Sequence, residues 1–99
     1  MASSDWTFHV DPGHGWLQVK YEDVVHLGLK DKITPSSYRA GDDVYLEEDV
    51  DAGVFLTEYL EQTGMAKGDL AFAEVVWGSD APCRGFDSYQ PDPVTMVED

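Results

Sequence analysis

The sequence predicts a small α+β domain of the order β-β-α-β-α-β, with two helices on one face of a four-stranded sheet. Two observations lead to this fold class. Four short segments alternate apolar and polar residues, as strands do, and two others repeat apolar residues at helical spacing. The chain of 99 residues, 42% of them hydrophobic, is long enough for a single core. We therefore expect residues 1–99 to form one domain.

A β-hairpin is predicted at the start, from strands at residues 6–10 and 15–21. Apolar residues alternate in both segments, which read "WTFHV" and "GWLQVKY". The intervening "DPGHG" is typical of a turn, because proline fixes one φ angle and glycine accepts positive values. The residues expected on the apolar face of the hairpin are Trp6, Phe8, Val10, Leu17, Val19 and Tyr21.

A short helix and a loop are expected next. In "YEDVVHLGL", residues 21–29, the acids Glu22 and Asp23 suit a first helical turn, and Gly28 stands where a left-handed residue ends a helix. The following stretch, "KDKITPSSYRAGDD", is predicted to be a loop because proline, serine and glycine interrupt any regular pattern.

The second half is predicted to contain a strand at residues 43–47, a main helix, and a last strand at residues 69–78. The main helix follows the change from alternation to helical spacing and ends at Gly64. "DLAFAEVVWG" gives the signal for the last strand. Residues 79–99 have no periodicity and contain several prolines, so we expect them to form an irregular acidic tail that Phe86 and Tyr89 partly hold against the domain.

The formal net charge of −14 lies almost entirely in residues 40–99, where only Lys67 and Arg84 oppose fifteen acids. Such a field repels nucleic acids and anionic membranes and attracts basic protein surfaces. The single Cys83 excludes an internal disulfide, and "MASSDWTF" lacks the features of a signal peptide. We therefore expect a cytoplasmic protein, a monomer or weak dimer, that binds neither nucleic acid nor membranes directly.

Acidic residues in and before the main helix are the best candidates for a binding site. With about 100° of rotation per residue, several of them share one face that points away from the apolar side. The candidate partner-binding residues are Glu47, Glu48, Asp51, Glu58 and Glu61 along this stripe, with Asp42, Asp43 and Asp49 at its edge. Val54 lies within the stripe and Val50 borders it, which favours a protein-binding surface. The alternatives are a solvated helix face, and capping of the helix by Glu48 or Asp49.

Metal-binding and catalytic alternatives have less support, and we expect no cofactor. Four acids have the spacing of EF-hand calcium ligands, although Ala52 replaces the glycine that the turn of that motif needs. They are Glu47, Asp49, Asp51 and Glu58. A second group near the hairpin turn lacks a fourth ligand and consists of His9, Asp11 and His14. No histidine or other base lies near Cys83 in the sequence, which favours a buried, inert thiol over a nucleophile.

Three segments within residues 12–55, "PGHGWLQV", "LGLKDKITPSSY" and "GDDVYLEEDVDAGVF", resemble a family of small proteins carried on plasmids and prophages. Size, acidity and the α+β pattern are also similar to those of anti-CRISPR and anti-restriction proteins. Many of these block nucleic-acid-binding defence enzymes by presenting carboxylates in place of phosphates. The resemblance implies a non-enzymatic inhibitor that binds the basic groove of a CRISPR effector or restriction enzyme in the host bacterial cytoplasm.

A function of a different class is the alternative. The protein would then be an interaction or regulatory module that binds its partner through exposed aromatic residues of the hairpin and tail, and its acidity would serve solubility. Salt separates the two hypotheses, because only binding through the acids weakens steeply as the ionic strength rises.

Overall fold

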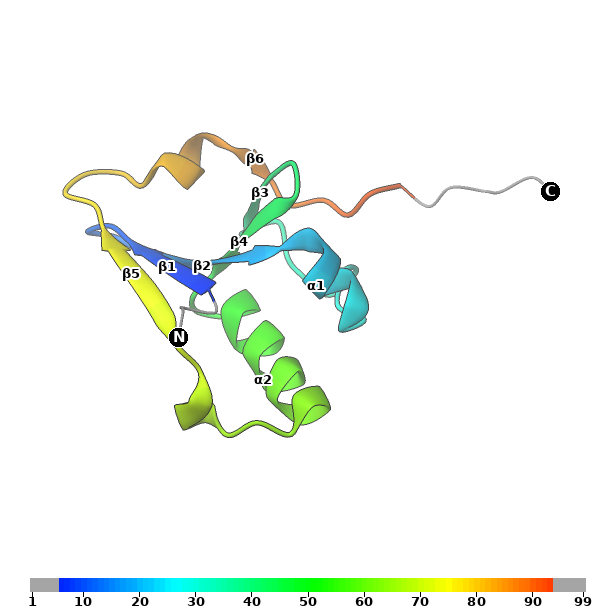
Figure 1. The fold of residues 1–99 in the computed structure, drawn as a ribbon. Helices are drawn as coiled ribbons and strands as arrows, with labels where there is room; N and C mark the ends of the chain where they lie inside the picture. Colours follow the sequence, from blue (N-terminus) through cyan, green and yellow to red (C-terminus); the bar gives the residue numbers. More distant parts are fainter. Residues whose placement is uncertain (1–5, 94–99) are drawn as a thin grey trace.

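A six-stranded mixed sheet and two α-helices form the fold of residues 6–93, the part of the chain that this computed structural model describes (Figure 1). The strands are β1 (Trp6–Val10), β2 (Gly15–Lys20), β3 (Tyr38–Ala40), β4 (Asp43–Glu47), β5 (Phe72–Val76) and β6 (Asp87–Ser88). The α-helices are α1 (Tyr21–His26) and α2 (Asp51–Thr63), and the 3₁₀-helices are η1 (Lys67–Asp69) and η2 (Pro82–Gly85). The strand order is β5-β1-β2-β4-β3-β6, and only the β1–β5 pair is parallel.

The predicted α+β class is confirmed, whereas the predicted four-stranded sheet and element order are wrong in detail. Strand β3 lies in the segment predicted to be a loop, and β6 lies in the predicted tail. Their lengths of three and two residues are too short to show an alternating pattern. They form through pairing, because β4 offers an edge to β3 and β3 then offers its own edge to β6.

The main core lies between one face of the sheet and the two helices. Leu17 and Val19 of β2 stand opposite Leu46 and Val44 of β4, and all four side chains are buried. The buried helix residues in the same cluster are Val24 of α1 and Ala52 and Phe55 of α2. The alternation predicted for the hairpin is therefore confirmed, and it faces the helices.

The other face of the sheet is covered by the segment that follows β5. Because β5 and β6 are the two outer strands, this segment must cross the width of the sheet, and Figure 1 shows it passing over that face in yellow and orange. Ala81 and Cys83 of this segment pack with Trp16 in a second buried cluster, bordered by Tyr45 and Trp77. The sheet therefore has a core on both faces.

Residues 89–92 hold the end of the described chain against the fold. Tyr89 is only 2% exposed, and its hydroxyl donates a hydrogen bond to the carbonyl of Lys30 at 2.6 Å. Arg39 stacks on the ring of Tyr21, donates to the carbonyl of Gln90 and pairs with Asp92. This part of the predicted tail is therefore packed, although most of it has no regular secondary structure.

Both helix ends and the start of α1 agree with the sequence prediction, whereas the start of α2 does not. Gly64 caps α2 with a φ angle of 74°, and Gly28 follows α1 with a φ angle of 77°, both in the left-handed region that glycine favours. Helix α2 begins only at Asp51, with Val50 as its N-cap and no side-chain capping bond. The prediction that Glu48 or Asp49 caps this helix is therefore wrong.

Candidate functional site

Asp51, which the sequence placed on an exposed acidic stripe, is fully buried. Its Oδ2 accepts hydrogen bonds from the backbone N–H of Thr34 at 3.0 Å, the Thr34 hydroxyl at 2.7 Å and the Ser37 hydroxyl at 2.6 Å. The Ser37 hydroxyl in turn accepts a bond from the backbone N–H of Glu47. Asp51 therefore fastens the loop before β3 to the start of α2, and it is unavailable to a partner.

Glu47 and Glu48 are also placed differently from the prediction, because neither lies on the helix. Residues 43–47 are extended, so their side chains alternate between two faces instead of rotating by a helical step. Glu47 ends β4 half-buried, and its Oε1 accepts a hydrogen bond from the Val50 N–H at 3.2 Å. Glu48 is exposed in the turn that follows. The continuous stripe from residue 47 to residue 61 does not exist.

Four exposed or half-buried acids nevertheless lie on α2 or in the turn that precedes it, and we call them the α2 acidic surface. They are Glu48, Asp49, Glu58 and Glu61. Asp49 and Glu58 border a shallow groove of about 490 Å³ together with Val50 and Val54. Val50 is 54% exposed, so this groove combines carboxylates with accessible apolar surface. Lys32 borders the same groove, from the loop that follows α1.

The basic side chains that form ion pairs do so away from the α2 acidic surface. Within residues 6–93, the closest ion pairs join Lys20 to Asp43, Arg39 to Asp92 and Arg84 to Asp11. The hydrogen bond to Asp43 raises the pKa of Lys20 above its ordinary value. Among the described residues, none of the four acids of the α2 surface takes part in an ion pair. Their negative charge is therefore not offset by a direct contact.

The predicted edge residues Asp42 and Asp43 lie apart from the α2 acidic surface. They precede or begin β4, whereas Glu48 and Asp49 follow its other end. Five steps of about 3.4 Å separate Asp43 from Glu48 by roughly 17 Å. Asp42 is exposed, while Lys20 partly neutralises Asp43 at 3.0 Å. These two acids form a separate, weaker negative region.

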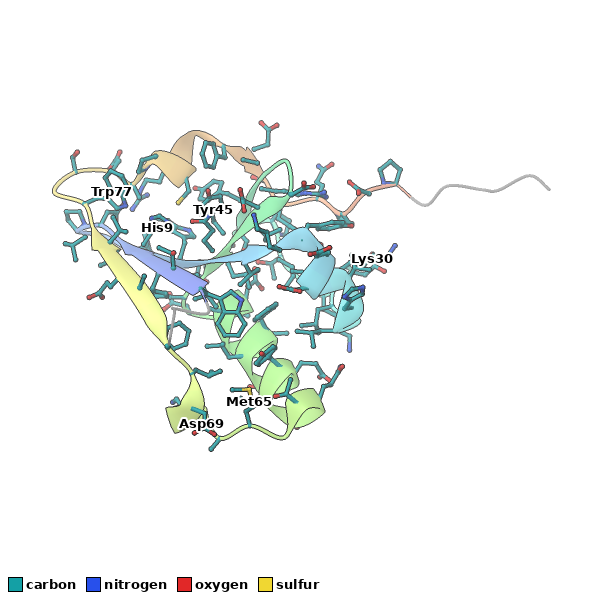
Figure 2. The ribbon with its side chains drawn as sticks, viewed as in Figure 1. His9, Lys30, Tyr45, Met65, Asp69 and Trp77 are labelled. Atoms are coloured by element: carbon teal, nitrogen blue, oxygen red, sulfur yellow. The ribbon has the colours of Figure 1, made fainter. Side chains whose placement is uncertain are left out.

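The metal or catalytic group considered near the hairpin turn, His9, Asp11 and His14, is not formed. Two of these residues, His9 and Asp11, are hydrogen-bonded to structural partners instead. His9 Nε2 lies 2.8 Å from the side-chain oxygen of Gln18, and Trp77 Nε1 donates to His9 Nδ1 at 3.3 Å. Since the indole N–H can only donate, the His9 proton belongs on Nε2. Figure 2 shows His9, Tyr45 and Trp77 together on the side of the sheet that faces the C-terminal segment.

Asp11 is buried and organises the hairpin turn. Arg84 donates to its two oxygens at 2.6 and 3.1 Å, and backbone N–H groups of Gly13, His14 and Ala81 donate at 2.9 Å each. The Arg84 hydrogen bonds, with help from these N–H groups, hold the pKa of Asp11 well below its usual range despite its burial. Asp11 is therefore a structural carboxylate that stays ionised.

Cys83 has the environment of an inert thiol, as favoured from the sequence. The side chain is buried, and burial raises its pKa to about 11, with the charge of Asp11 acting in the same direction. The neighbouring Arg84 is engaged with Asp11 and does little to favour the thiolate. A thiol that remains protonated at neutral pH is a poor nucleophile.

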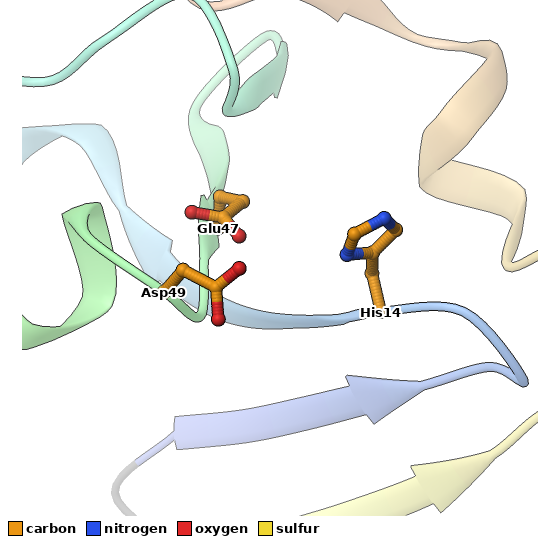
Figure 3. A group of neighbouring side chains, drawn as sticks. All are labelled: His14, Glu47 and Asp49. Carbon is orange, nitrogen blue, oxygen red and sulfur yellow. The ribbon is translucent and has the colours of Figure 1, made fainter.

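One constellation was missed by sequence reasoning. The exposed His14 lies next to Glu47 and Asp49, and their possible ligand atoms are all within 4.8 Å of one another (Figure 3). Two separate sequence patterns contained these residues, the histidines of the hairpin turn and the acids with EF-hand spacing. The pairing of β2 with β4 could have joined them, because it brings the hairpin turn level with the end of β4.

In comparisons with known proteins, no family model, curated protein or solved structure matches this chain. In the described part of the chain, neither helix combines the length and apolar character that a membrane crossing requires.

Proposed function

We propose that this protein is a non-enzymatic inhibitor that binds the basic nucleic-acid-binding groove of a bacterial defence complex, such as a CRISPR effector or a restriction enzyme. In this proposal the α2 acidic surface takes the place of nucleic-acid phosphates. The observation that carries the proposal is the set of four carboxylates around α2, none of which has an ion-pair partner within residues 6–93. A basic groove would supply the missing positive charge.

The acids lie on a rigid part of this protein, which supports their recognition by a basic groove. Glu58 and Glu61 stand on a 13-residue helix, and Asp49 stands in the turn that leads into it. Because α2 is fixed by the burial of Ala52 and Phe55, these carboxylates lose little backbone freedom on binding. The helix spans about 20 Å, a length over which one strand of DNA presents roughly six phosphates.

Charge reversal on α2 tests the proposal. Glu58→Lys combined with Glu61→Lys should weaken capture of the target by about tenfold or more, because it removes two attractive charges and adds two repulsive ones. The matched control is Asp80→Lys combined with Asp87→Lys, which changes the net charge equally on the segment that covers the other face of the sheet. Removal of a positive charge that does not border the groove, by Lys30→Ala, should leave capture nearly unchanged.

The target itself is sought by a pull-down from nuclease-treated bacterial lysate at low and at moderate salt, read by mass spectrometry. Recovery of a DNA-binding defence enzyme that moderate salt releases would support the proposal, and equal losses in the α2 and control variants would reject the α2 surface. Inhibition is then measured as the loss of DNA binding by the recovered enzyme.

The alternative of an interaction module is supported by Phe86 of the predicted tail, which is 36% exposed, and by one exposed aromatic residue outside the hairpin and tail. The aromatic side chains of Trp16 and Tyr89, in the hairpin and in the predicted tail, are buried and unavailable. Phe72 of β5 is 43% exposed and lies beside a mostly apolar hollow of about 380 Å³ that includes Phe8 and Leu56. A partner whose capture resists salt and depends on Phe72 would favour this function.

A further inference from the structure

Three potential metal ligands from separate parts of the chain meet on the surface beside the second core. His14 belongs to the turn between β1 and β2, Glu47 is the last residue of β4, and Asp49 lies in the turn before α2. Their imidazole and carboxylate ligand atoms all lie within 4.8 Å of one another, and Figure 3 shows the three side chains pointing into one shared space.

The backbone around these residues is fixed by hydrogen bonds. Trp16 of β2 stands opposite Glu47 of β4, and the Glu48 N–H donates to the carbonyl of Gly15 at 3.0 Å, which extends the pairing by one step. On the other side, the buried Asp11 accepts a bond from the His14 N–H through its side chain and donates its own N–H to the His14 carbonyl. The fold therefore brings His14 to the end of β4 before any ion binds.

The carboxylates of the cluster have no basic side chain as an ion-pair partner among the described residues. Glu47 and Asp49 form no ion pair there. Arg84 lines the same hollow of about 480 Å³, but its guanidinium is engaged with Asp11 at 2.6 Å. Two carboxylates held this close repel each other, and a cation between them removes that cost.

A second observation points to a ligand in this hollow. Trp16, which lines it, is 98% buried, and its indole N–H has no hydrogen-bond acceptor in the described part of the chain. Buried N–H groups are nearly always paired. A ligand that enters this hollow would offer such an acceptor.

We infer that His14, Glu47 and Asp49 bind a divalent transition-metal ion, with Zn²⁺ as the representative. One imidazole nitrogen with two carboxylate oxygens suits Zn²⁺ and its first-row neighbours, whereas Ca²⁺ and Mg²⁺ take oxygen ligands almost entirely. In a tetrahedral site with bonds of about 2.1 Å, ligand atoms are about 3.4 Å apart. Binding would therefore need the ligand atoms, now within 4.8 Å of one another, to approach by up to about 1.4 Å, and the exposed side chains of His14 and Asp49 are free to rotate by that amount.

Three protein ligands leave at least one coordination position for water or for a small molecule in the hollow. Glu47 also keeps its bond to the N–H of Val50 through Oε1, which leaves Oε2 for the ion. The ion would tie the hairpin turn to the start of α2, so its binding should stabilise the folded protein. This inference does not rest on the proposed inhibitor function, although Asp49 belongs to both surfaces, so a bound ion would lower the negative charge at one end of the α2 acidic surface.

The test uses full-length protein freed of metal with EDTA, followed by removal of the chelator and addition of ZnCl₂ alone. We expect Zn²⁺ to raise the melting temperature and CaCl₂ at the same concentration to leave it unchanged, because only the ion that binds the folded state stabilises it. In calorimetric titrations, His14→Ala and Asp49→Asn should each weaken Zn²⁺ affinity by about tenfold or more.

Two controls separate this site from adventitious binding. Glu48→Gln removes an exposed carboxylate next to the cluster, and His26→Ala removes an exposed imidazole on α1; both should bind Zn²⁺ like the wild type. Should a cluster variant fail to fold, the imidazole NMR signals of wild-type His14 give the answer directly, since Zn²⁺ must shift them and leave those of His26 in place. Unchanged His14 signals, or equal binding by the His14 variant, would overturn the inference.

Discussion

At the scale of single residues, acids with the same chemistry have opposite roles in this protein. Asp11 and Asp51 are buried and accept several hydrogen bonds each, whereas Asp49 and Glu61 are exposed. Residue type does not distinguish these roles. The difference depends on partners distant in sequence, such as Ser37 for Asp51, which come together only in the folded chain.

Asp51→Ala should lower the free energy of unfolding by about 3 kcal/mol, because it leaves the donors of Thr34 and Ser37 buried without their charged acceptor. The exposed neighbour Asp49 is the matched control, and its alanine variant should change the free energy by less than about 0.5 kcal/mol. Urea denaturation followed by tryptophan fluorescence measures both. Similar effects at the two positions would contradict the structural role of Asp51.

The candidate site was predictable only in part, because the direction of each acidic side chain depends on whether its residue lies in a strand, a turn or a helix. The sequence predicted an acidic stripe over residues 47–61, in which Glu58 and Glu61 have no ion-pair partner in the described chain but Asp51 is buried. The phasing of this stripe was wrong because it extended the helix back to Glu47, whereas α2 starts at Asp51 and the preceding residues follow strand geometry. The cluster of His14 with Glu47 required the β2–β4 register, which no local pattern contains.

At the scale of elements, strong local patterns predicted the hairpin, β4, both helices and β5. Alternation of large apolar residues specified the face of the sheet that the helices cover, and glycine marked both helix ends. Strands β3 and β6 were missed because pairing with existing strands stabilises them, not their own composition. The packing of the segment from Trp77 to Tyr89 was also missed. Its few apolar side chains, which cover the second face of the sheet, are separated by turn residues and form no periodic pattern in the sequence.

Tyr89 tests whether this C-terminal segment contributes to stability. Tyr89→Phe should cost about 1 kcal/mol of unfolding free energy, because it removes the 2.6 Å hydrogen bond to Lys30 and keeps the ring. Tyr89→Ala should cost about 4 kcal/mol, because it also opens a cavity in the main core. Thermal and chemical unfolding of the two variants measure the difference. If Tyr89→Ala were as stable as Tyr89→Phe, Tyr89 would not hold the C-terminal segment against the fold, contrary to the expectation from the sequence and to its burial in the main core.

At the scale of the whole molecule, the structure holds a large negative charge on a small surface. The formal net charge is −14, and Asp11 and Asp51 are the buried acids of the described chain. Lys20, Arg39 and Arg84 each neutralise an acid through an ion pair, so they cannot balance the α2 acidic surface. Folding therefore concentrates repulsion that a solubility role alone does not require.

This repulsion gives salt two opposite effects. For the free protein, raising NaCl from about 20 to about 500 mM should raise the melting temperature by a few degrees, because counterions screen the acids from one another. The rise should be smaller for Glu58→Lys combined with Glu61→Lys, which relieves repulsion in the α2 acidic surface. EDTA in every sample keeps a bound metal ion from contributing to the shift.

The same increase in salt should release the bound target if the acids replace phosphates, because the attraction across the interface is screened as well. A stabilised protein that nevertheless dissociates cannot owe its release to unfolding, so the two measurements together assign the salt effect to the interface. A complex that survives the higher salt while the free protein is stabilised would instead be held by apolar contacts, and Phe72 of β5 would then be the first residue to replace.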